Sequence, residues 1–342
     1  MTPSLPTYDL FVGVDIAAVT AAVAWQRPDA PRSRVLTIAQ TPAGCATRIA
    51  QLQATAVTPT RTLVVMEATG SYWITLATTL HDAGYAVSVI NPAQAHAFAN
   101  ALLKRAKTDA IDAQTLTQLA AMRQPAPWTP PPAVYHELQQ RLAERDALLD
   151  LRQQVRNQRH ALLPQPTVIA AVRTRMETLI ATLTAQIAAV EAELVPALAQ
   201  DAAWAAAAAR LQTITGVGLL TASWLLVTTV CFTTCPTPEA ATAYAGLAPN
   251  ERSSGTSVYQ RPRIGHTGNA RLRTALYMAT LSAAARNPVI KPFYDRLRAA
   301  GKPMKVARCA AARKLLHLAW AVVTKEQDFD PDYAQRQPAG AP

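Results

Sequence analysis

The stretch Phe11-Val12-Gly13-Val14-Asp15-Ile16 decides the fold of the N-terminal part of this chain, because four large apolar residues and a glycine surround a single carboxylate. Such a short apolar run predicts a buried β-strand that carries Asp15 near its end. Residues 21–26 predict its hairpin partner and residues 35–39 a third strand. Leu63-Val64-Val65-Met66-Glu67 predicts another buried strand, which ends on a second carboxylate.

Helical patterns alternate with the later strands. Residues 43–54 and 73–83 predict helices, residues 86–90 a strand, and residues 93–122 further helical stretches. Strands that come first and then alternate with helices are typical of a mixed sheet with helices on its faces. We therefore expect an α/β domain with a mixed sheet and flanking helices over residues 1–123.

The middle of the chain predicts a linker and a helical hairpin. Five prolines within residues 124–134 exclude both helix and strand, so we interpret this segment as a semi-rigid linker. Residues 135–200 predict two long helices, of which the second carries an apolar stripe at helical spacing. The stripe consists of Val168, Val172, Met176, Leu179, Leu183, Ile187, Val190, Leu194 and Leu198. This pattern predicts a coiled-coil hairpin whose stripes are buried either within one chain or in a dimer.

The C-terminal part is basic. Residues 205–328 predict a mostly α-helical domain, and residues 329–342 a polar, flexible tail. Residues 251–314 hold 14 Lys and Arg against 2 acidic residues, so this segment accounts for the whole formal net charge of +11. A concentrated positive charge indicates a polyanionic partner, and nucleic acid is the natural one.

Cysteine usage and hydropathy indicate a reduced, cytoplasmic protein. The four cysteines form no CxxC pair, no signal peptide opens the chain, and half of the residues are hydrophobic, which excludes a disordered chain. The longest apolar core without charge, residues 217–232, is shorter than the ~20 residues that a membrane-spanning helix needs. We therefore expect a buried helix there and no membrane partner.

Four carboxylates are candidates for a metal site. Asp15 and Glu67 lie at the ends of apolar strands, where a buried charge is costly unless it is paired or binds a cation. Asp109 and Asp112 stand three residues apart, on one face of a helix. Hard divalent cations prefer such oxygen ligands, and two-metal phosphoryl transfer needs several of them at one spot. The alternative is a structural role for each residue, in a turn, an ion pair or a helix cap.

The basic region offers two kinds of phosphate contact. Gly216 and Gly218 precede an apolar helix, as in a helix-hairpin-helix, where backbone N–H groups approach a phosphate; a plain turn is the alternative. The turn-rich stretch of residues 244–255 contains Ser254, and a serine beside several arginines can attack a phosphodiester. The alternative is a loop whose arginines only hold phosphates. The side chains assigned to nucleic-acid binding are Lys107, Arg252, Arg261, Arg263, Arg271, Arg273, Lys302, Lys305 and Arg308.

Six motifs, in this order, resemble the DEDD transposases of bridge-RNA-guided insertion sequences, also called seekRNA-guided. They are Gly13-Val14-Asp15, Met66-Glu67-Ala68-Thr69-Gly70, Lys107-Thr108-Asp109-Ala110-Ile111-Asp112-Ala113, Gly246-Leu247-Ala248-Pro249, Ser254-Gly255 and Gly268-Asn269-Ala270-Arg271-Leu272-Arg273. The resemblance covers residues 8–323. It implies an N-terminal RNase H-like domain similar to the RuvC Holliday-junction resolvase, then a coiled coil, and a C-terminal transposase domain with a catalytic serine.

The resemblance also implies roles for single residues. It implies Mg²⁺ or Mn²⁺ ligands at Asp15, Glu67, Asp109 and Asp112, and a nucleophile at Ser254 that forms a 5′-phosphoserine intermediate, with Ser253 as the alternative nucleophile. The implied function is recombination of donor and target double-stranded DNA, guided by a structured non-coding RNA. The implied assembly is a tetramer made of two dimers, associated with a prokaryotic nucleoid.

Two other functions stay open at this point. One is a metal-dependent nuclease of the Holliday-junction type, which hydrolyses DNA with water and uses no serine. The other is a nucleic-acid-binding protein whose carboxylates are only structural.

Overall fold

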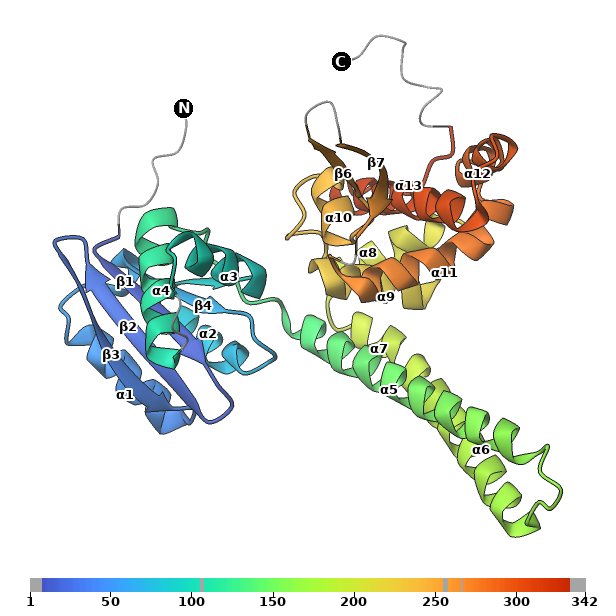
Figure 1. Ribbon diagram of the computed structural model, residues 1–342, viewed down its shortest axis with the longest axis horizontal. Helices are drawn as coiled ribbons and strands as arrows, with labels where there is room; N and C mark the ends of the chain where they lie inside the picture. The colour runs from blue at the N-terminus through green and yellow to red at the C-terminus, as the bar shows by residue number, and fades with distance from the viewer. Residues whose placement is uncertain (1–7, 105–107, 255–257, 266, 333–342) are drawn as a thin grey trace, which may run out of the picture. The chain divides into compact units, whose positions relative to one another are not determined.

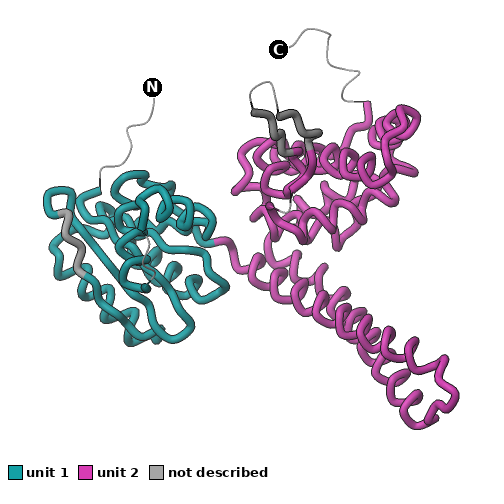
Figure 2. Tube along the Cα trace, viewed as in Figure 1, with its two compact units in different colours: residues 1–130 teal, residues 131–342 magenta. Residues whose placement is uncertain are grey.

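The computed structural model describes residues 8–104, 108–254, 258–265 and 267–332, and divides the chain into two compact units. These units are residues 1–130 and residues 131–342 (Figure 2), and the division falls inside the proline-rich segment 124–134. Each unit has hydrophobic clusters of its own.

Within the described residues, the first unit is built on a five-stranded sheet with the strand order β3-β2-β1-β4-β5 (Figure 1). The strands are β1 (Leu10–Ile16), β2 (Thr20–Arg27), β3 (Ala30–Ala39), β4 (Thr62–Glu67) and β5 (Ala86–Ile90). β1 pairs antiparallel with β2 and parallel with β4, and β4 pairs parallel with β5. The predicted mixed sheet is therefore confirmed.

Helices cover both faces of this sheet. They are α1 (Pro42–Gln53), the 3-10 turn η1 (Pro59–Arg61), α2 (Trp73–Asp82), α3 (Pro92–Ala101) and α4 (Asp109–Arg123). Side-chain oxygens of Thr41, Asn91 and Thr108 accept backbone N–H bonds at the starts of α1, α3 and α4, which is why these helices begin where they do.

The alternation of side chains along β1 separates two cores. Leu10, Val12 and Val14 pack in one cluster with residues of α1 and α2. Phe11 belongs to a second cluster on the opposite face, together with residues of α3 and α4. Because side chains two apart on a strand share a face, Asp15 lies on the same face as Phe11, the one covered by α3 and α4.

The second unit is mostly helical. Its helices are α5 (Ala133–Leu162), α6 (Ala170–Ala192), α7 (Leu194–Leu198), α8 (Ala202–Thr213), α9 (Leu219–Thr229), α10 (Pro238–Tyr244), α11 (Ala270–Arg286), α12 (Ile290–Ala299) and α13 (Met304–Thr324). The predicted buried helix is α9, whose Leu225 and Leu226 are fully buried in the main cluster of this unit.

One element of this unit differs from the expectation of helix and turn. β6 (Pro249–Ser254) and β7 (Val258–Ile264) form a two-stranded antiparallel sheet, in which Ser254 pairs with Val258. No alternation of apolar and polar residues marks these strands in the sequence. The signal on which strand prediction depends is therefore missing.

α5 and α6 form a hairpin within the chain and lie side by side (Figure 1). Arg141 Nε donates to Glu193 Oε2 at 3.0 Å and Arg145 Nε to Glu191 Oε1 at 2.6 Å, which sets the antiparallel register. The apolar stripe is only partly covered: Leu183, Ile187 and Val190 are buried, whereas Leu179 is 46% exposed. Coiled-coil packing and dimerisation through the stripe stay predictions.

Among the described residues, one stretch, Ala170–Leu198, is long and apolar enough to cross a membrane by length and composition. A single helix of this kind is weak evidence for a membrane span. In this chain its last turns are tied to α5 by the ion pairs of Glu191 and Glu193.

Candidate active site

Two strand ends and one helix start bring the four predicted carboxylates to one place. Val14 of β1 pairs with Met66 of β4 in parallel register, so the next residues, Asp15 and Glu67, end neighbouring strands. Both side chains lie on the sheet face that α3 and α4 cover. Asp109 and Asp112 lie in the first turn of α4, where the partial positive charge of a helix N-terminus favours carboxylates.

Gly13 determines how closely α4 approaches β1. A β-carbon at Gly13 would lie 2.7 Å from Thr117 Oγ1 and closer still to two backbone atoms, Ala113 O and Thr117 N. The helix therefore rests directly on the strand backbone. The Thr117 hydroxyl shares its proton between Ala113 O of its own helix, at 2.9 Å, and Ala24 O of β2, at 3.1 Å, which links the helix to the sheet just beyond the carboxylates.

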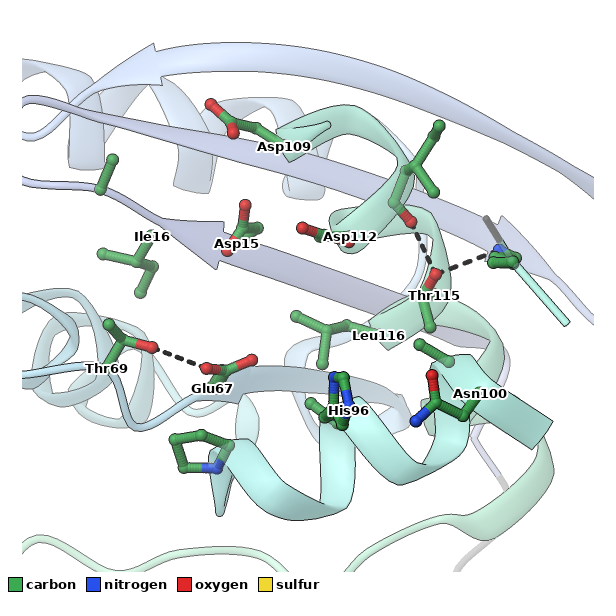
Figure 3. Close-up of a pocket in the computed structure, with 16 residues that line it drawn as sticks. Asp15, Ile16, Glu67, Thr69, His96, Asn100, Asp109, Asp112, Thr115 and Leu116 are labelled. Carbon is green, nitrogen blue, oxygen red and sulfur yellow. Dashed lines mark hydrogen bonds between the residues drawn. The ribbon is translucent and has the colours of Figure 1, made fainter. Parts of the chain in front are cut away.

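The carboxylates line a single cavity of about 630 Å³. Figure 3 shows Asp15, Glu67, Asp109 and Asp112 around the same space, with α3 on the opposite side. Asp15, Glu67 and Asp112 are half-buried and Asp109 is exposed. Thr69 Oγ1 donates to Glu67 Oε1 at 2.8 Å and so fixes that carboxylate.

Burial and the neighbouring carboxylates shift the titration of Asp15. The pKa of Asp15 is raised to about 6, first by partial burial and then by the charges of Asp112, Asp109 and Glu67 in that order. The backbone hydrogen bond from Ile16 opposes this shift. The same negative charges that raise the pKa of Asp15 also favour a cation in their midst.

The donor chemistry fits a hard divalent cation, because all four groups are carboxylates from elements that meet at one cavity. As placed, no three His, Cys, Asp or Glu side chains among the described residues lie close enough together to hold one. Carboxylates that repel each other spread apart, and a bound cation would reverse that repulsion. The four carboxylates are therefore a candidate metal site by their chemistry and their shared cavity.

Sequence reasoning missed several residues of this cavity. His96 and Asn100 of α3 line it, as do Thr69 and Thr115 (Figure 3), and so does Lys104. Lys104 Nζ donates to Thr115 Oγ1 at 3.1 Å. Partial burial lowers the pKa of Lys104, and the charge of Asp112 opposes that shift. The one available signal was a lysine five residues before Asp109, which no spacing rule singles out.

The two glycines predicted to approach a phosphate occupy different surroundings. Gly216 has a φ of +105°, and a β-carbon there would lie 2.7 Å from Ala283 Cβ of α11. Close packing therefore requires this glycine. Gly218 precedes α9 and a β-carbon there would meet nothing within 4 Å. A phosphate contact by either residue stays a prediction.

Two of the arginines predicted to bind nucleic acid also make bonds within the protein. Arg271 Nη2 donates to Asp146 Oδ1 of α5 at 2.5 Å, and its guanidinium lies 4.3 Å from the centre of the Trp224 ring. Arg273 Nη1 donates to the carbonyl oxygens of Ala245 at 3.2 Å and Thr267 at 3.1 Å. Both arginines therefore hold parts of the second unit together.

The other residues predicted to bind nucleic acid differ in their exposure to solvent. Lys302, Lys305 and Arg263 are exposed. Arg308 lies over the Tyr277 ring, 6.0 Å from its centre. Lys107 lies outside the described residues, and so do the side chains of Arg252, Ser253, Ser254 and Arg261, whose backbones lie in β6 and β7.

Comparison with known proteins identifies the family. The chain matches a DEDD transposase family of IS110 type over residues 12–167, and the transposase IS116/IS110/IS902 family over residues 208–295. It is also 30% identical over 268 residues to the pilin gene-inverting proteins of Moraxella lacunata and Moraxella bovis, covering 78% of this chain and 81% of theirs. This chain belongs to the IS110 family of transposases.

A further IS110-family relative supports the N-terminal match. The insertion element IS110 uncharacterized 43.6 kDa protein of Streptomyces coelicolor is 36% identical over 132 residues, which cover 38% of this chain and 31% of that protein. The predicted family and its DNA-recombining activity are confirmed at this level. Transposase domains of the DEDD type generally use a divalent metal ion.

Proposed function

We propose that this IS110-family transposase is an RNA-guided recombinase that cuts and rejoins donor and target DNA through Ser254, assisted by Mg²⁺. One observation carries the proposal: four carboxylates from β1, β4 and α4 line one cavity. The residues that line this cavity lie within the range 12–167 that matches the DEDD family, and Ser254 lies within the range 208–295 that matches the second transposase family, which supports the proposal. The strand order and strand directions of the first unit support an RNase H-like fold for the DEDD domain.

The residues divide the chemistry between them. Asp15, Glu67, Asp109 and Asp112 would hold the divalent metal, which would supply positive charge beside the scissile phosphate. Ser254 Oγ bonds to the phosphorus while the bond to the 3′ oxygen breaks, and the 3′-hydroxyl leaves with the proton that the serine gave up. The 5′-phosphoserine ester conserves the bond energy, so a new 3′-hydroxyl can rejoin the strand.

A covalent-adduct experiment tests the nucleophile. The protein is incubated with labelled donor and target DNA and with RNA transcribed from the non-coding DNA beside its gene, and is then denatured. Wild type is expected to retain labelled DNA and Ser254→Ala to lose it, while Ser253→Ala, the matched neighbour, keeps it. An adduct that survives in Ser254→Ala and is lost in Ser253→Ala makes Ser253 the nucleophile.

The same reaction separates the proposal from its alternatives. Strand cleavage without an adduct in any protein, wild type included, would establish the junction nuclease that uses water. Asp109→Asn and Asp112→Asn are expected to bind DNA and RNA but to cut neither strand. Leaving out the RNA is expected to abolish cutting, and cutting that continues without it would refute guidance by RNA.

A further inference from the structure

We propose that Lys104 is a further catalytic residue, whose ammonium binds a non-bridging oxygen of the scissile phosphate in the carboxylate cavity. This inference rests on the proposed function of that cavity as the DNA-cutting site. The nearest alternative is that Lys104 only relieves repulsion between the carboxylates. The two roles predict different responses when the phosphate itself loses its charge.

The backbone directs Lys104 to the cavity. After α3 the N–H of Leu103 donates to Asn100 O at 3.0 Å and the N–H of Lys104 to Ala99 O at 3.3 Å, the paired bonds of a Schellman turn. Such a turn needs a residue in the left-handed region, and here it is Leu103, with a φ of +55°. A leucine in this conformation costs about 1 kcal/mol relative to glycine. The side chain of Leu103 is 85% exposed, so no burial offsets that cost.

Side-chain bonding then holds the ammonium in place. The Thr115 hydroxyl donates its proton to Ile111 O at 2.7 Å, so its oxygen can only accept, and it accepts from Lys104 Nζ. Thr115 is 4% exposed and lies one turn after Asp112 on α4. An ammonium has three N–H donors, so Lys104 can keep Thr115 as a partner and still bind an oxygen in the cavity.

The negative charge of the cavity favours an ammonium group in it. Among the described residues that line the cavity, Lys104 is the one Lys or Arg, facing four carboxylates. A phosphodiester is itself an anion, so it enters such a cavity only with cations beside it. A lysine contributes a point charge suited to a phosphate oxygen, and the bond to Thr115 holds that charge beside α4.

The test pairs a protein change with a change at one phosphate. Two duplexes of the donor DNA are made, identical except that the scissile phosphate is either a normal phosphodiester or an uncharged methylphosphonate. Binding of each is measured by fluorescence anisotropy, in Mg²⁺, for wild type, Lys104→Gln and Lys104→Arg. Arg123→Gln is the matched control, because it removes the same charge from the exposed far end of α4.

A direct contact predicts coupling between the two changes. For wild type and Arg123→Gln, the methylphosphonate should weaken binding by about tenfold, the effect of losing one charge-assisted hydrogen bond. In Lys104→Gln the methylphosphonate should weaken binding clearly less than in wild type, because only the attraction between the metal ion and this phosphate is left to lose. Lys104→Arg should restore most of the difference. Equal weakening in wild type and Lys104→Gln would overturn the proposal, since a residue that only offsets carboxylate repulsion does not sense the phosphate charge.

Failure of this inference is separable from failure of the proposed function. Cleavage of the normal duplex is followed in the same proteins, and Lys104→Gln is expected to cut at least tenfold more slowly than Arg123→Gln. Slow cleavage by Lys104→Gln, together with equal weakening of binding by the methylphosphonate in wild type and Lys104→Gln, would make Lys104 structural and leave the recombinase proposal intact. Coupled binding without cleavage by any protein would keep the Lys104 contact and reject the proposed reaction.

Discussion

Replacing Gly13 with alanine tests how the carboxylate cavity is assembled. The added β-carbon would lie 2.7 Å from Thr117 Oγ1, and 3.4 Å is where ordinary contact begins, so the hydroxyl must recede by 0.7 Å. The backbone atoms Ala113 O and Thr117 N would be closer still, and backbone atoms cannot rotate away. α4 as a whole must therefore move off β1.

The cost of that movement follows from what α4 loses. Overpacking of this kind costs about 1–3 kcal/mol. The hydrogen bond from Thr117 Oγ1 to Ala24 O would also stretch, at about 1 kcal/mol more. We therefore expect the free energy of unfolding of the first unit to fall by about 2–4 kcal/mol. Asp109 and Asp112 would move away from Asp15 together with their helix, so affinity for Mn²⁺ should fall as well.

Urea denaturation of the full chain, followed by circular dichroism, measures the first effect, and Mn²⁺ titration followed by electron paramagnetic resonance measures the second. Hydrogen exchange over residues 109–123 should accelerate. Gly218→Ala is the matched control, because its φ of −91° suits alanine and a β-carbon there meets nothing within 4 Å. If Gly13→Ala and Gly218→Ala both unfold and bind Mn²⁺ like wild type, the close approach of α4 to β1 does not determine the site.

Further predictions concern charge and assembly. Because the pKa of Asp15 is about 6 in the folded state and 3.8 in model peptides, metal-free protein gains stability from this group below pH 3.8 and loses it as the pH rises to 6. The full pKa shift corresponds to about 3 kcal/mol of stability, and solvent screening of this half-exposed group reduces it to about 1–2 kcal/mol. Asp15→Asn should therefore be more stable than wild type near pH 7.5. Equal urea midpoints of the two proteins at that pH would contradict this. Arg271→Met should cost about 1–2 kcal/mol in urea denaturation, because it removes both the bond to Asp146 and the stacking on Trp224, and an unchanged midpoint would refute that role. Changing Lys302, Lys305 and Arg308 together to Glu should weaken binding to unrelated duplexes alike and flatten the salt dependence, whereas loss at one sequence alone would point to base recognition. Mixing Asp109→Asn with Ser254→Ala protein should restore some recombination if different chains supply the carboxylates and the serine, and inactive mixtures that still assemble would reject such a shared site.

Local patterns in the sequence were sufficient for much of the first unit. Apolar runs predicted β1 and β4 and placed Asp15 and Glu67 at their ends, because a buried strand needs a continuous apolar run. The spacing of Asp109 and Asp112 placed both on one helix face, because an α-helix turns every 3.6 residues. Prolines marked the segment in which the two units divide.

Only the tertiary structure decided which of the predicted binding residues have partners within the protein. It also decided which residues that the sequence did not mark line the carboxylate cavity. The sequence assigned Arg271 to nucleic-acid binding, and the structure adds a carboxylate partner, Asp146, which lies 125 residues earlier on another helix. No pattern in the sequence around Lys104 predicted its position beside the carboxylates. A left-handed turn at Leu103 and the hydroxyl of Thr115 determine that position. The spacing of apolar residues in the sequence predicts which face of a helix or strand is buried. Which side chains meet in one site depends on packing between elements that are far apart in the chain. A helix can rest on β1 at Gly13 because that residue lacks a side chain, and this contact places α4 above Asp15.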